Sequence, residues 1–329
     1  MKPSAPWSAS LLLFFAALAT SLSFAQTAPA SHDQQATAAP PQLAILDTDI
    51  GDDIDDAFAL ALVLRSPEIK LLGITTTYAD TELRARLVDR YLAAVGRSEI
   101  PVAAGRITPH ANIFTQAAYA NRQPDHLHPD AVKFLLEQIK AHPGQITLIE
   151  IGPMVNVQDA YARDPETFRK LKRVVLMGGS IYRGYGPSAA KPTPPEPEWN
   201  IVRDPAGAQA LLASGVPVYM LPLDSTQIHL HSADRERIFS FGSFLTDQLT
   251  LLYHQWAAHN DQSTRTPTLY DPVAAAYAVR PDLCPMTPLH IEIDDKGFTR
   301  PGPGKPNVHA CLKSDENAFL AFYLNRVAH

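Results

Sequence analysis

Short apolar runs alternate with helical patterns along most of this chain, and the alternation restricts its fold more than any other feature. Five runs are β-branched or continuously apolar, as strands covered on both faces are. They are Leu43–Leu46, Lys70–Thr77, Ile146–Ile151, Val174–Met177 and Val216–Leu223. Helical patterns with Gly, Pro or Ser signals at their ends span Asp55–Arg65, Glu82–Val95, Ala131–Ala141 and Asp204–Ser214. The order predicts an α/β fold, a mostly parallel open sheet with helices on both faces.

The pattern changes from Pro285 onward. His290–Ile293 and Asn307–Leu312 have the composition of short strands, and Asp315–Val327 that of a last helix. We therefore expect a small β appendage near the C-terminus. No internal repeat is visible, so residues 42–329 are predicted to form one domain.

The first 41 residues differ in composition from the rest. Lys2, the apolar run Leu11–Leu22 and the sequence Ser23-Phe24-Ala25 match the three parts of a secretory signal. The apolar stretch is shorter than the roughly 20 residues of a membrane span. We predict a signal peptide at 1–25 and a disordered linker, rich in Ala, Pro, Gln and Thr, at 26–41. We therefore predict a periplasmic or secreted protein without stable membrane insertion. Because the N-terminal region carries little positive charge, an uncleaved membrane anchor is the alternative.

Charge and cysteine content exclude several classes of protein. The sequence has 28 Lys and Arg against 34 Asp and Glu, a net charge of −6, and so lacks the basic composition of a nucleic-acid-binding protein. Cys284 and Cys311 are the wrong pattern for a structural zinc site. Export would permit a disulfide between them, and two buried free thiols are the alternative.

Acidic residues and glycines follow the predicted strands, where open α/β sheets bind ligands. Asp80, Gly152-Pro153, Gly178-Gly179 and Asp224 each follow one strand, and six aspartates lie between Asp47 and Asp56 after the first. Such crowded carboxylates repel one another unless a cation joins them, and calcium accepts six to eight oxygen ligands. An EF-hand is excluded because its twelfth position would be Phe58. A haloacid-dehalogenase-like start fits Asp47-Thr48-Asp49 but leaves the other acids unexplained.

The acidic segment resembles the N-terminal signature of the inosine–uridine-preferring nucleoside hydrolases, in a variant two residues longer. Further segments resemble that family's motifs in the family's order and cover essentially the whole mature chain. They are Ile74–Asp80 (ITTTYAD), Ile151–Asn156 (IGPMVN), Val175–Gly179 (VLMGG), Glu198–Asn200 (EWN), Asp204-Pro205 and Tyr270–Pro272 (YDP). The resemblance implies a Rossmann-like nucleoside hydrolase fold and calcium-dependent hydrolysis of the N-glycosidic bond of ribonucleosides. It also implies a homodimer or homotetramer.

The resemblance implies a role for each matching residue. The calcium ligands would be Asp49, Asp56, the carbonyl of Ile151 and Asp271. Asp49 would also take the proton of the attacking water, whose pKa the metal lowers. Asp55, Glu198 and Asn200 would bind ribose hydroxyls, and Met177 would pack against the sugar.

This chain departs from the family pattern in several places. Asp80 stands where the family has an Asn beside the attacking water, and Tyr270 where some members have a His that protonates the leaving base. The insertion leaves open whether Asp52 or Asp53 shares the roles of Asp55. A Pro-rich segment, Tyr182–Pro197, replaces the family's usual sequence, so the preferred base is undetermined.

Aromatic and histidine side chains are candidates for the base pocket. Trp199 and the group Tyr253, His254, Trp256 and His259 are compatible with base contacts or with packing, while His110, His126 and His128 are expected on the surface. Two alternative functions remain at this stage. One is a ribosyl hydrolase with a non-standard leaving group, and the other is a calcium-dependent ribose- or nucleoside-binding protein without turnover.

Overall fold

The computed structural model describes residues 40–109, 114–186, 193–261 and 266–329. The predicted signal peptide, nearly all of the predicted linker and His110 lie outside these residues. Strand β1, Gln42–Thr48, begins where the folded domain was predicted to begin.

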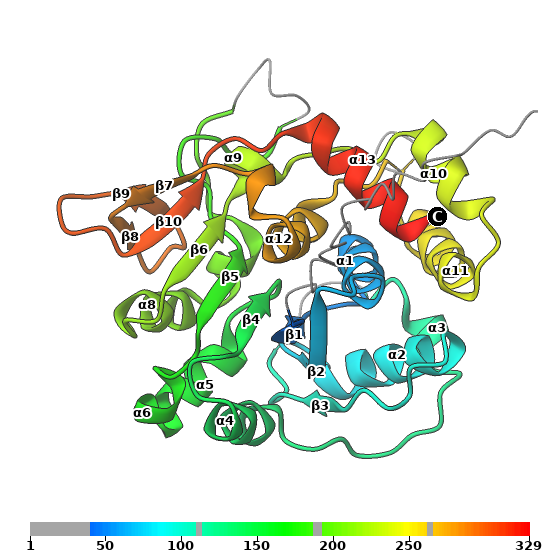
Figure 1. Cartoon of the computed structure of the whole chain (residues 1–329), viewed down its shortest axis with the longest axis horizontal. Coiled ribbons are helices and arrows are strands. Elements are labelled where there is room, and N and C mark those ends of the chain that lie inside the picture. The colour runs from blue at the N-terminus through cyan, green and yellow to red at the C-terminus, as the bar shows by residue number, and fades with distance from the viewer. Residues whose placement is uncertain (1–39, 110–113, 187–192, 262–265) are drawn as a thin grey trace, which may run out of the picture. The chain divides into compact units, whose positions relative to one another are not determined.

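An eight-stranded sheet forms the centre of the molecule (Figure 1). Its order is β3-β2-β1-β4-β5-β6-β10-β7, and all neighbouring pairs are parallel except β10 with β7. The strands besides β1 are β2 (Ile69–Thr76), β3 (Val102–Ala104), β4 (Thr147–Glu150), β5 (Arg173–Met177), β6 (Val218–Leu221), β7 (Met286–Leu289) and β10 (Val308–Cys311). The chain first builds outward from β1 through β2 to β3 and then crosses to β4 on the other side. The gap between β1 and β4 is therefore the switch point, beyond whose carboxyl ends such sheets bind ligands.

Side chains alternate between the two faces of the sheet and belong to two separate hydrophobic cores. Ala44 and Leu46 of β1 join one core, whereas Ile45 between them joins the other. Val175 and Val174 of β5 divide in the same way. Strands apolar on both sides in this manner can be covered by helices on both faces.

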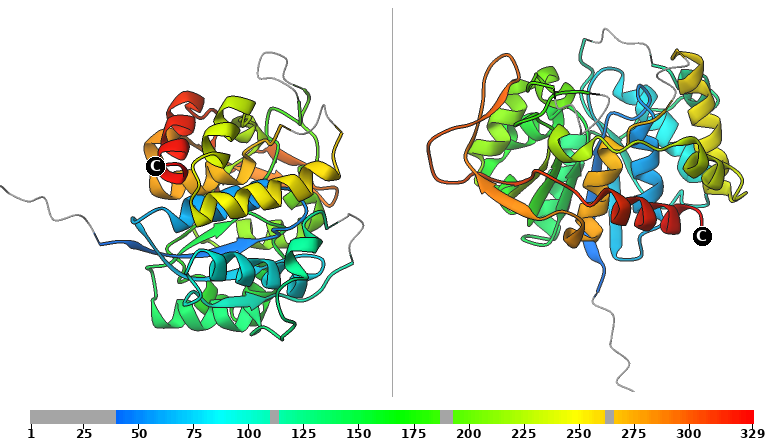
Figure 2. Two further views of the ribbon diagram at one scale, coloured as in Figure 1. Left: turned by 90° about the vertical axis from the view of Figure 1, so that its right-hand side faces the viewer. Right: turned by 90° about the horizontal axis from the view of Figure 1, so that it is seen from above.

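Helices cover both faces (Figures 1 and 2). The first core includes residues of α1 (Asp55–Leu64), α2 (Thr81–Ala94), α10 (Ser232–Phe239), α11 (Phe244–Ala258), α12 (Tyr270–Val279) and α13 (Glu316–Val327). The second includes residues of α4 (Ala131–Ala141), α5 (Val155–Arg163) and α8 (Pro205–Ala213). Shorter segments are α3 (Ala117–Ala120), α6 (Pro165–Phe168), α7 (Trp199–Arg203), α9 (Leu223–Thr226) and the 3₁₀ turn Pro281–Leu283. The predicted fold class is confirmed.

The C-terminal appendage is smaller than the sequence suggested. The predicted strand Asn307–Leu312 corresponds to β10, which pairs with β6 and extends the main sheet. Only β8 (Ile291–Ile293) and β9 (Thr299–Pro301) form a separate antiparallel hairpin. A disulfide joins Cys284 to Cys311 of β10, with 5.8 Å between the Cα atoms. This connects the end of the 3₁₀ turn to the sheet.

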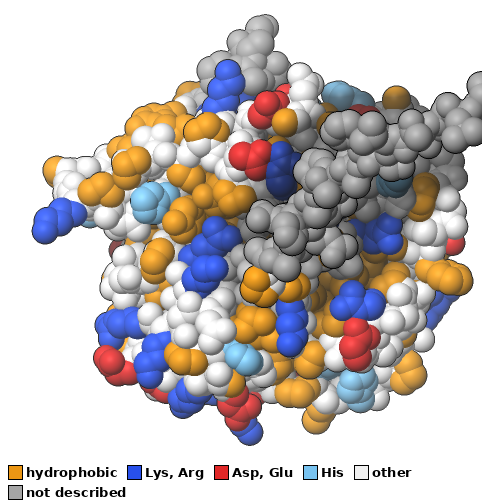
Figure 3. All heavy atoms as spheres, viewed as in Figure 1, with side chains coloured by type: hydrophobic (Ala, Val, Ile, Leu, Met, Phe, Trp, Pro, Cys, Tyr) orange, Lys and Arg blue, Asp and Glu red, His pale blue; other side chains and the backbone are white. Residues whose placement is uncertain are grey.

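Length and apolar character decide whether a helix could cross a bilayer. Among the described residues, no helix combines the length and apolar character that crossing a membrane requires. On the face drawn in Figure 3, Lys and Arg side chains lie among acidic and apolar ones.

Candidate active site

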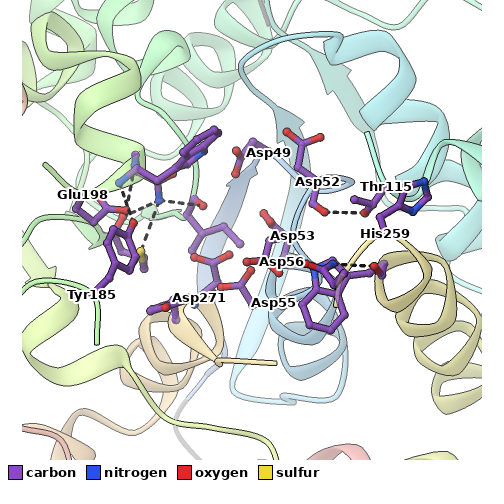
Figure 4. Close-up of a pocket in the computed structure, with 17 residues that line it drawn as sticks. Asp49, Asp52, Asp53, Asp55, Asp56, Thr115, Tyr185, Glu198, His259 and Asp271 are labelled. Atoms are coloured by element: carbon purple, nitrogen blue, oxygen red, sulfur yellow. Dashed lines mark hydrogen bonds between the residues drawn. The ribbon is translucent and has the colours of Figure 1, made fainter. Parts of the chain in front are cut away.

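A cavity of about 580 Å³ opens at the carboxyl ends of β1, β4 and β5. Figure 4 shows aspartates at its centre, with Glu198 and Tyr185 on one side and Thr115 and His259 on the other. Nine of the ten residues assigned to the site from sequence line it: Asp49, Asp55, Asp56, Ile151, Met177, Glu198, Asn200, Tyr270 and Asp271. Asp52 and Asp53 line it as well.

Two helices begin at the cavity floor. Asp55 and Asp56 form the first turn of α1, and Asp271 lies in the first turn of α12, which packs against α1. Their carboxylates offer three oxygens within 4.8 Å of one another, all buried. The Asp271 backbone N–H donates to Asp55 Oδ2 at 3.3 Å. Helix N-termini favour negative charge, yet two of them offset only part of the repulsion among these acids.

Burial raises the pKa of each of these carboxyl groups. The pKa of Asp55, Asp56 and Asp271 lies well above its ordinary value, because each group is desolvated and faces the charge of neighbouring aspartates. Burial also raises the pKa of Asp49 to about 7, although the charge of Arg84 opposes the shift. A hard divalent cation would restore these groups to their charged form. The donor set, all oxygen, buried and convergent, fits such an ion.

Arg84 holds the acidic loop, residues 49–54 between β1 and α1, in place. It was not identified from the sequence. Its side chain is fully buried, and its guanidinium donates to the carbonyls of Asp49, Ile50 and Tyr78 and to Asp52 Oδ2. The only signal was positional, since Arg84 lies on the otherwise apolar stripe of α2 with Val88 and Tyr91. A charged residue on a core-facing stripe requires buried partners.

One wall of the cavity comes from β4, β5 and the start of α7. The Asn200 side-chain amide donates to the Ile151 carbonyl at 3.3 Å and to the Met177 carbonyl at 3.1 Å. Glu198 caps α7, and its carboxylate accepts backbone N–H groups from Gly179, Asn200 and Ile201. Burial raises the pKa of Glu198 to about 7 despite these bonds. Glu198 is therefore fixed in place before any ligand binds.

Aromatic side chains form the outer part of the cavity. The rings of Tyr185 and Tyr270 meet edge to face, 6.0 Å apart, and the Tyr185 hydroxyl accepts the backbone N–H of Trp199 at 3.0 Å. Trp256 lines the cavity from α11, and the exposed His259 lies at the end of that helix. Of the sequence candidates for base contacts, Trp199, Trp256 and His259 face the cavity, whereas Tyr253 and His254 do not line it.

The structure does not place Asp80 in the cavity, contrary to the sequence expectation. Asp80 is exposed, and its side chain caps α2 by accepting the backbone N–H of Leu83 at 3.0 Å. Tyr78 and Ala79 before it have positive φ angles of 60°, so the chain turns sharply between the end of β2 and Asp80. Capping of helix α2 explains why an aspartate stands at position 80.

Comparisons with known proteins agree with this geometry. The family model for inosine–uridine preferring nucleoside hydrolases matches residues 44–321. The chain belongs to this family. A pyrimidine-specific ribonucleoside hydrolase of Citrobacter koseri is 29% identical over 315 residues, covering 86% of this chain and 97% of that protein. A probable uridine nucleosidase of Oryza sativa is 28% identical, covering 78% and 79%.

Solved nucleoside hydrolases have the same fold. A plant nucleoside hydrolase matches with a TM-score of 0.77 at 24% identity, covering 88% of this chain and 99% of that one. A purine-preferring ribonucleoside hydrolase from Gardnerella vaginalis matches with a TM-score of 0.72 at 24% identity, covering 87% and 98%. The predictions of the family and of an N-glycosyl hydrolase are thus confirmed. The roles of individual residues remain predictions.

Proposed function

We propose that this nucleoside hydrolase uses calcium, held at the cavity floor, to hydrolyse ribonucleosides to ribose and free base. The observation that carries the proposal is the convergence of buried aspartates from the loop after β1, from α1 and from α12 at one cavity. Asp49, Asp56, Asp271 and the Ile151 carbonyl would hold the ion. When bound, calcium supplies positive charge that neutralises these carboxylates, orients ribose hydroxyls and lowers the pKa of a neighbouring water.

The protein's own groups carry the remaining steps. Asp49 accepts the proton of the attacking water as the bond to C1′ forms and the bond to the base breaks. Positive charge then develops on the sugar, and the surrounding carboxylates stabilise it. Asp55, Glu198 and Asn200 bind ribose hydroxyls, and Met177 packs against the ring.

Hydrogen-bond donation to the leaving base is assigned to Tyr270. Burial raises the pKa of its phenol above the ordinary value, so the hydroxyl stays protonated at neutral pH and can donate a hydrogen bond. Tyr185, whose ring contacts Tyr270, is the second hydroxyl on this wall. Because this wall supplies phenols and indoles, aromatic stacking fits the base better than an ionic contact.

Turnover on a panel of purine and pyrimidine ribonucleosides tests the proposal. Activity should disappear with a chelator and return with calcium, and return more weakly with magnesium, which tolerates irregular oxygen sites less well. Full activity in chelator would contradict the metal assignment. Binding of nucleosides with no turnover on any of them would favour the alternative of a binding protein.

We also propose that the protein is exported, serves nucleoside scavenging outside the cytoplasm, and assembles into a homodimer or homotetramer. The N-terminal sequence supports export, and the disulfide is compatible with an oxidising compartment. Mass analysis of the mature protein tests cleavage after Ala25, and light scattering tests assembly. An intact N-terminus on cytoplasmic protein would overturn the first, and a monomer the second.

A further inference from the structure

A second group of metal-ligand side chains lies on the outer side of α2, and none of its members lines the active-site cavity. Glu82 and Asp89 project from α2, while His126 and His128 come from the segment that precedes α4. His126 and His128 were expected on the surface from sequence. That expectation is wrong for His128, whose side chain is only 2% exposed.

His128 lies between two carboxylates. Its Nδ1 is 2.7 Å from Glu82 Oε2, and its Nε2 is 3.0 Å from Asp89 Oδ2. His126 Nε2 approaches the same Asp89 oxygen at 3.2 Å, and the two imidazole rings are 4.3 Å apart. Ligand atoms of two imidazoles and one carboxylate thus lie within 4.8 Å of one another.

The distances correspond to the ligand spacing of a zinc ion. Ligands at about 2.0–2.1 Å in a tetrahedral arrangement lie about 3.3 Å from each other. The two nitrogen–oxygen separations of 3.0 and 3.2 Å need to widen by only a few tenths of an ångström. Glu82 provides an independent indication, since metal-binding histidines usually donate their second ring N–H to a carboxylate, which fixes the tautomer.

We propose that Asp89, His126 and His128 bind one divalent ion of the zinc class, with Glu82 orienting His128. Imidazole nitrogens favour zinc over calcium, which selects oxygen-only sites. Three protein ligands leave a fourth position for water. Arg86 lies on the same helix, and its charge faces Asp125 at 3.5 Å, which limits its repulsion of the ion.

The site would fix the segment that precedes α4 to helix α2. That segment also holds the acidic loop, because Thr115 Oγ1 donates to the Asp52 carbonyl at 2.6 Å and Gln116 Nε2 to the Asp53 carbonyl at 2.6 Å. Zinc would therefore stabilise the wall of the cavity from outside without touching the substrate. Its role is structural support for the active site.

Cobalt titration of the full mature chain, without a histidine tag and with calcium in excess, tests the proposal. Tetrahedral cobalt with nitrogen ligands absorbs visible light strongly, whereas cobalt on an oxygen-only cluster absorbs weakly. We expect one equivalent of the strong band and its loss on adding zinc. His126→Ala should abolish the band, and Glu82→Gln should weaken binding about tenfold to 100-fold. His309→Ala, an exposed histidine elsewhere, should change nothing.

A thermal measurement complements the titration. Zinc should raise the unfolding temperature of the calcium-loaded protein, and His126→Ala, whose side chain is half exposed and which should fold normally, should lose that gain. No visible band, or the same band in His126→Ala and in the parent, would overturn the proposal and leave the cluster as a hydrogen-bonded contact only. Calcium-dependent turnover in the parent is measured separately, so the two proposals fail independently.

Discussion

Asp49 differs in its surroundings from the three cavity aspartates that begin helices. Asp55, Asp56 and Asp271 lie in the first turns of helices, whereas Asp49 lies in the loop after β1, and Arg84 holds its carbonyl. Arg84 thus positions Asp49 through the backbone carbonyl and does not bond to the Asp49 carboxylate. A proton acceptor requires such a defined position with a free oxygen toward the water.

Asp49→Asn should abolish hydrolysis while nucleoside binding in calcium survives. The amide oxygen can still approach the ion, but the amide cannot accept a proton. We expect kcat to fall about 10²–10⁴-fold, as for loss of a general base. Single-turnover kinetics together with calorimetric binding check this. Retention of most activity would move the role to Asp52 or Asp53, which also line the cavity.

Tyr270→Phe should separate leaving-group protonation from packing. If the phenol donates to the base, inosine-like substrates slow by about tenfold or more, which is roughly 1.4 kcal/mol of transition-state stabilisation. Hydrolysis of p-nitrophenyl riboside should hardly change, because its leaving group departs unaided. Equal losses on both substrates would exclude the acid role. Tyr185→Phe and His259→Ala would then be the next variants to compare, since both side chains line the cavity.

Arg84→Met should destabilise the protein strongly. The change leaves the Asp52 carboxylate and three backbone carbonyls without the guanidinium that they share. Breaking a buried ion pair from one side typically costs about 3–5 kcal/mol. Denaturant unfolding measures this, with Arg97→Met, an arginine paired only near the surface, as the control. A loss no larger than that of the control would show that the loop does not depend on Arg84.

At the scale of elements, most strands and the helices α1, α2, α4, α8 and α13 were predicted from the sequence, whereas α5, α12 and the strands β3 and β7 were not. Ala131–Ala141 has the predicted bounds, since Asp130 caps it and His142-Pro143 ends it. β7 was missed because Pro288 and its exposed residues hide the strand pattern at the sheet edge. β3 was missed because three residues are too few for a period to appear. Such segments become strands through their neighbours, which a single sequence does not display.

The disulfide should stabilise the link between the 3₁₀ turn and β10. It closes a loop with a sequence separation of 27, for which loop entropy predicts about 3–4 kcal/mol. Reduction, or the double change Cys284→Ser and Cys311→Ser, should lower the unfolding temperature by equal amounts. Thiol titration of the native and unfolded protein verifies the oxidation state. Two titratable thiols in the protein as purified would contradict the bond.

At the scale of the whole molecule, the loops that meet at the carboxyl edge of the sheet were predictable, because the strand order fixes them. Parallel strands bring their carboxyl ends together, so Asp49 and Ile151 had to meet at the switch point. Arg84 and the buried position of His128 depend instead on how α2 packs, and Asp80 on a turn with two positive φ angles. Motifs locate loops on an edge of the sheet, whereas the direction of each side chain depends on packing.

Removing the metal should make stability fall as pH rises. Without a cation, the folded-state pKa of Asp49 is about 7 and those of Asp56 and Asp271 lie well above their ordinary value, against about 4 in the unfolded chain. Groups with raised folded pKa values contribute stability that is complete below pH 4 and is lost as pH rises through the folded values. Chelated protein should therefore unfold at a lower temperature at pH 8 than at pH 5.

Calcium should remove most of that dependence, because it binds the deprotonated carboxylates and stabilises the folded state by mass action. At 100 times the dissociation constant the gain is about 2.7 kcal/mol, and it should be larger at pH 8 than at pH 5. Calorimetric scans at both pH values, with chelator and with calcium, measure the difference. Asp271→Asn should reduce the calcium gain, while Asp224→Asn, at a carboxylate that binds backbone N–H groups outside the cavity, should leave it unchanged. If chelated and calcium-loaded protein unfolded at the same temperature at pH 8, the buried aspartates would have to be stabilised by protonation alone.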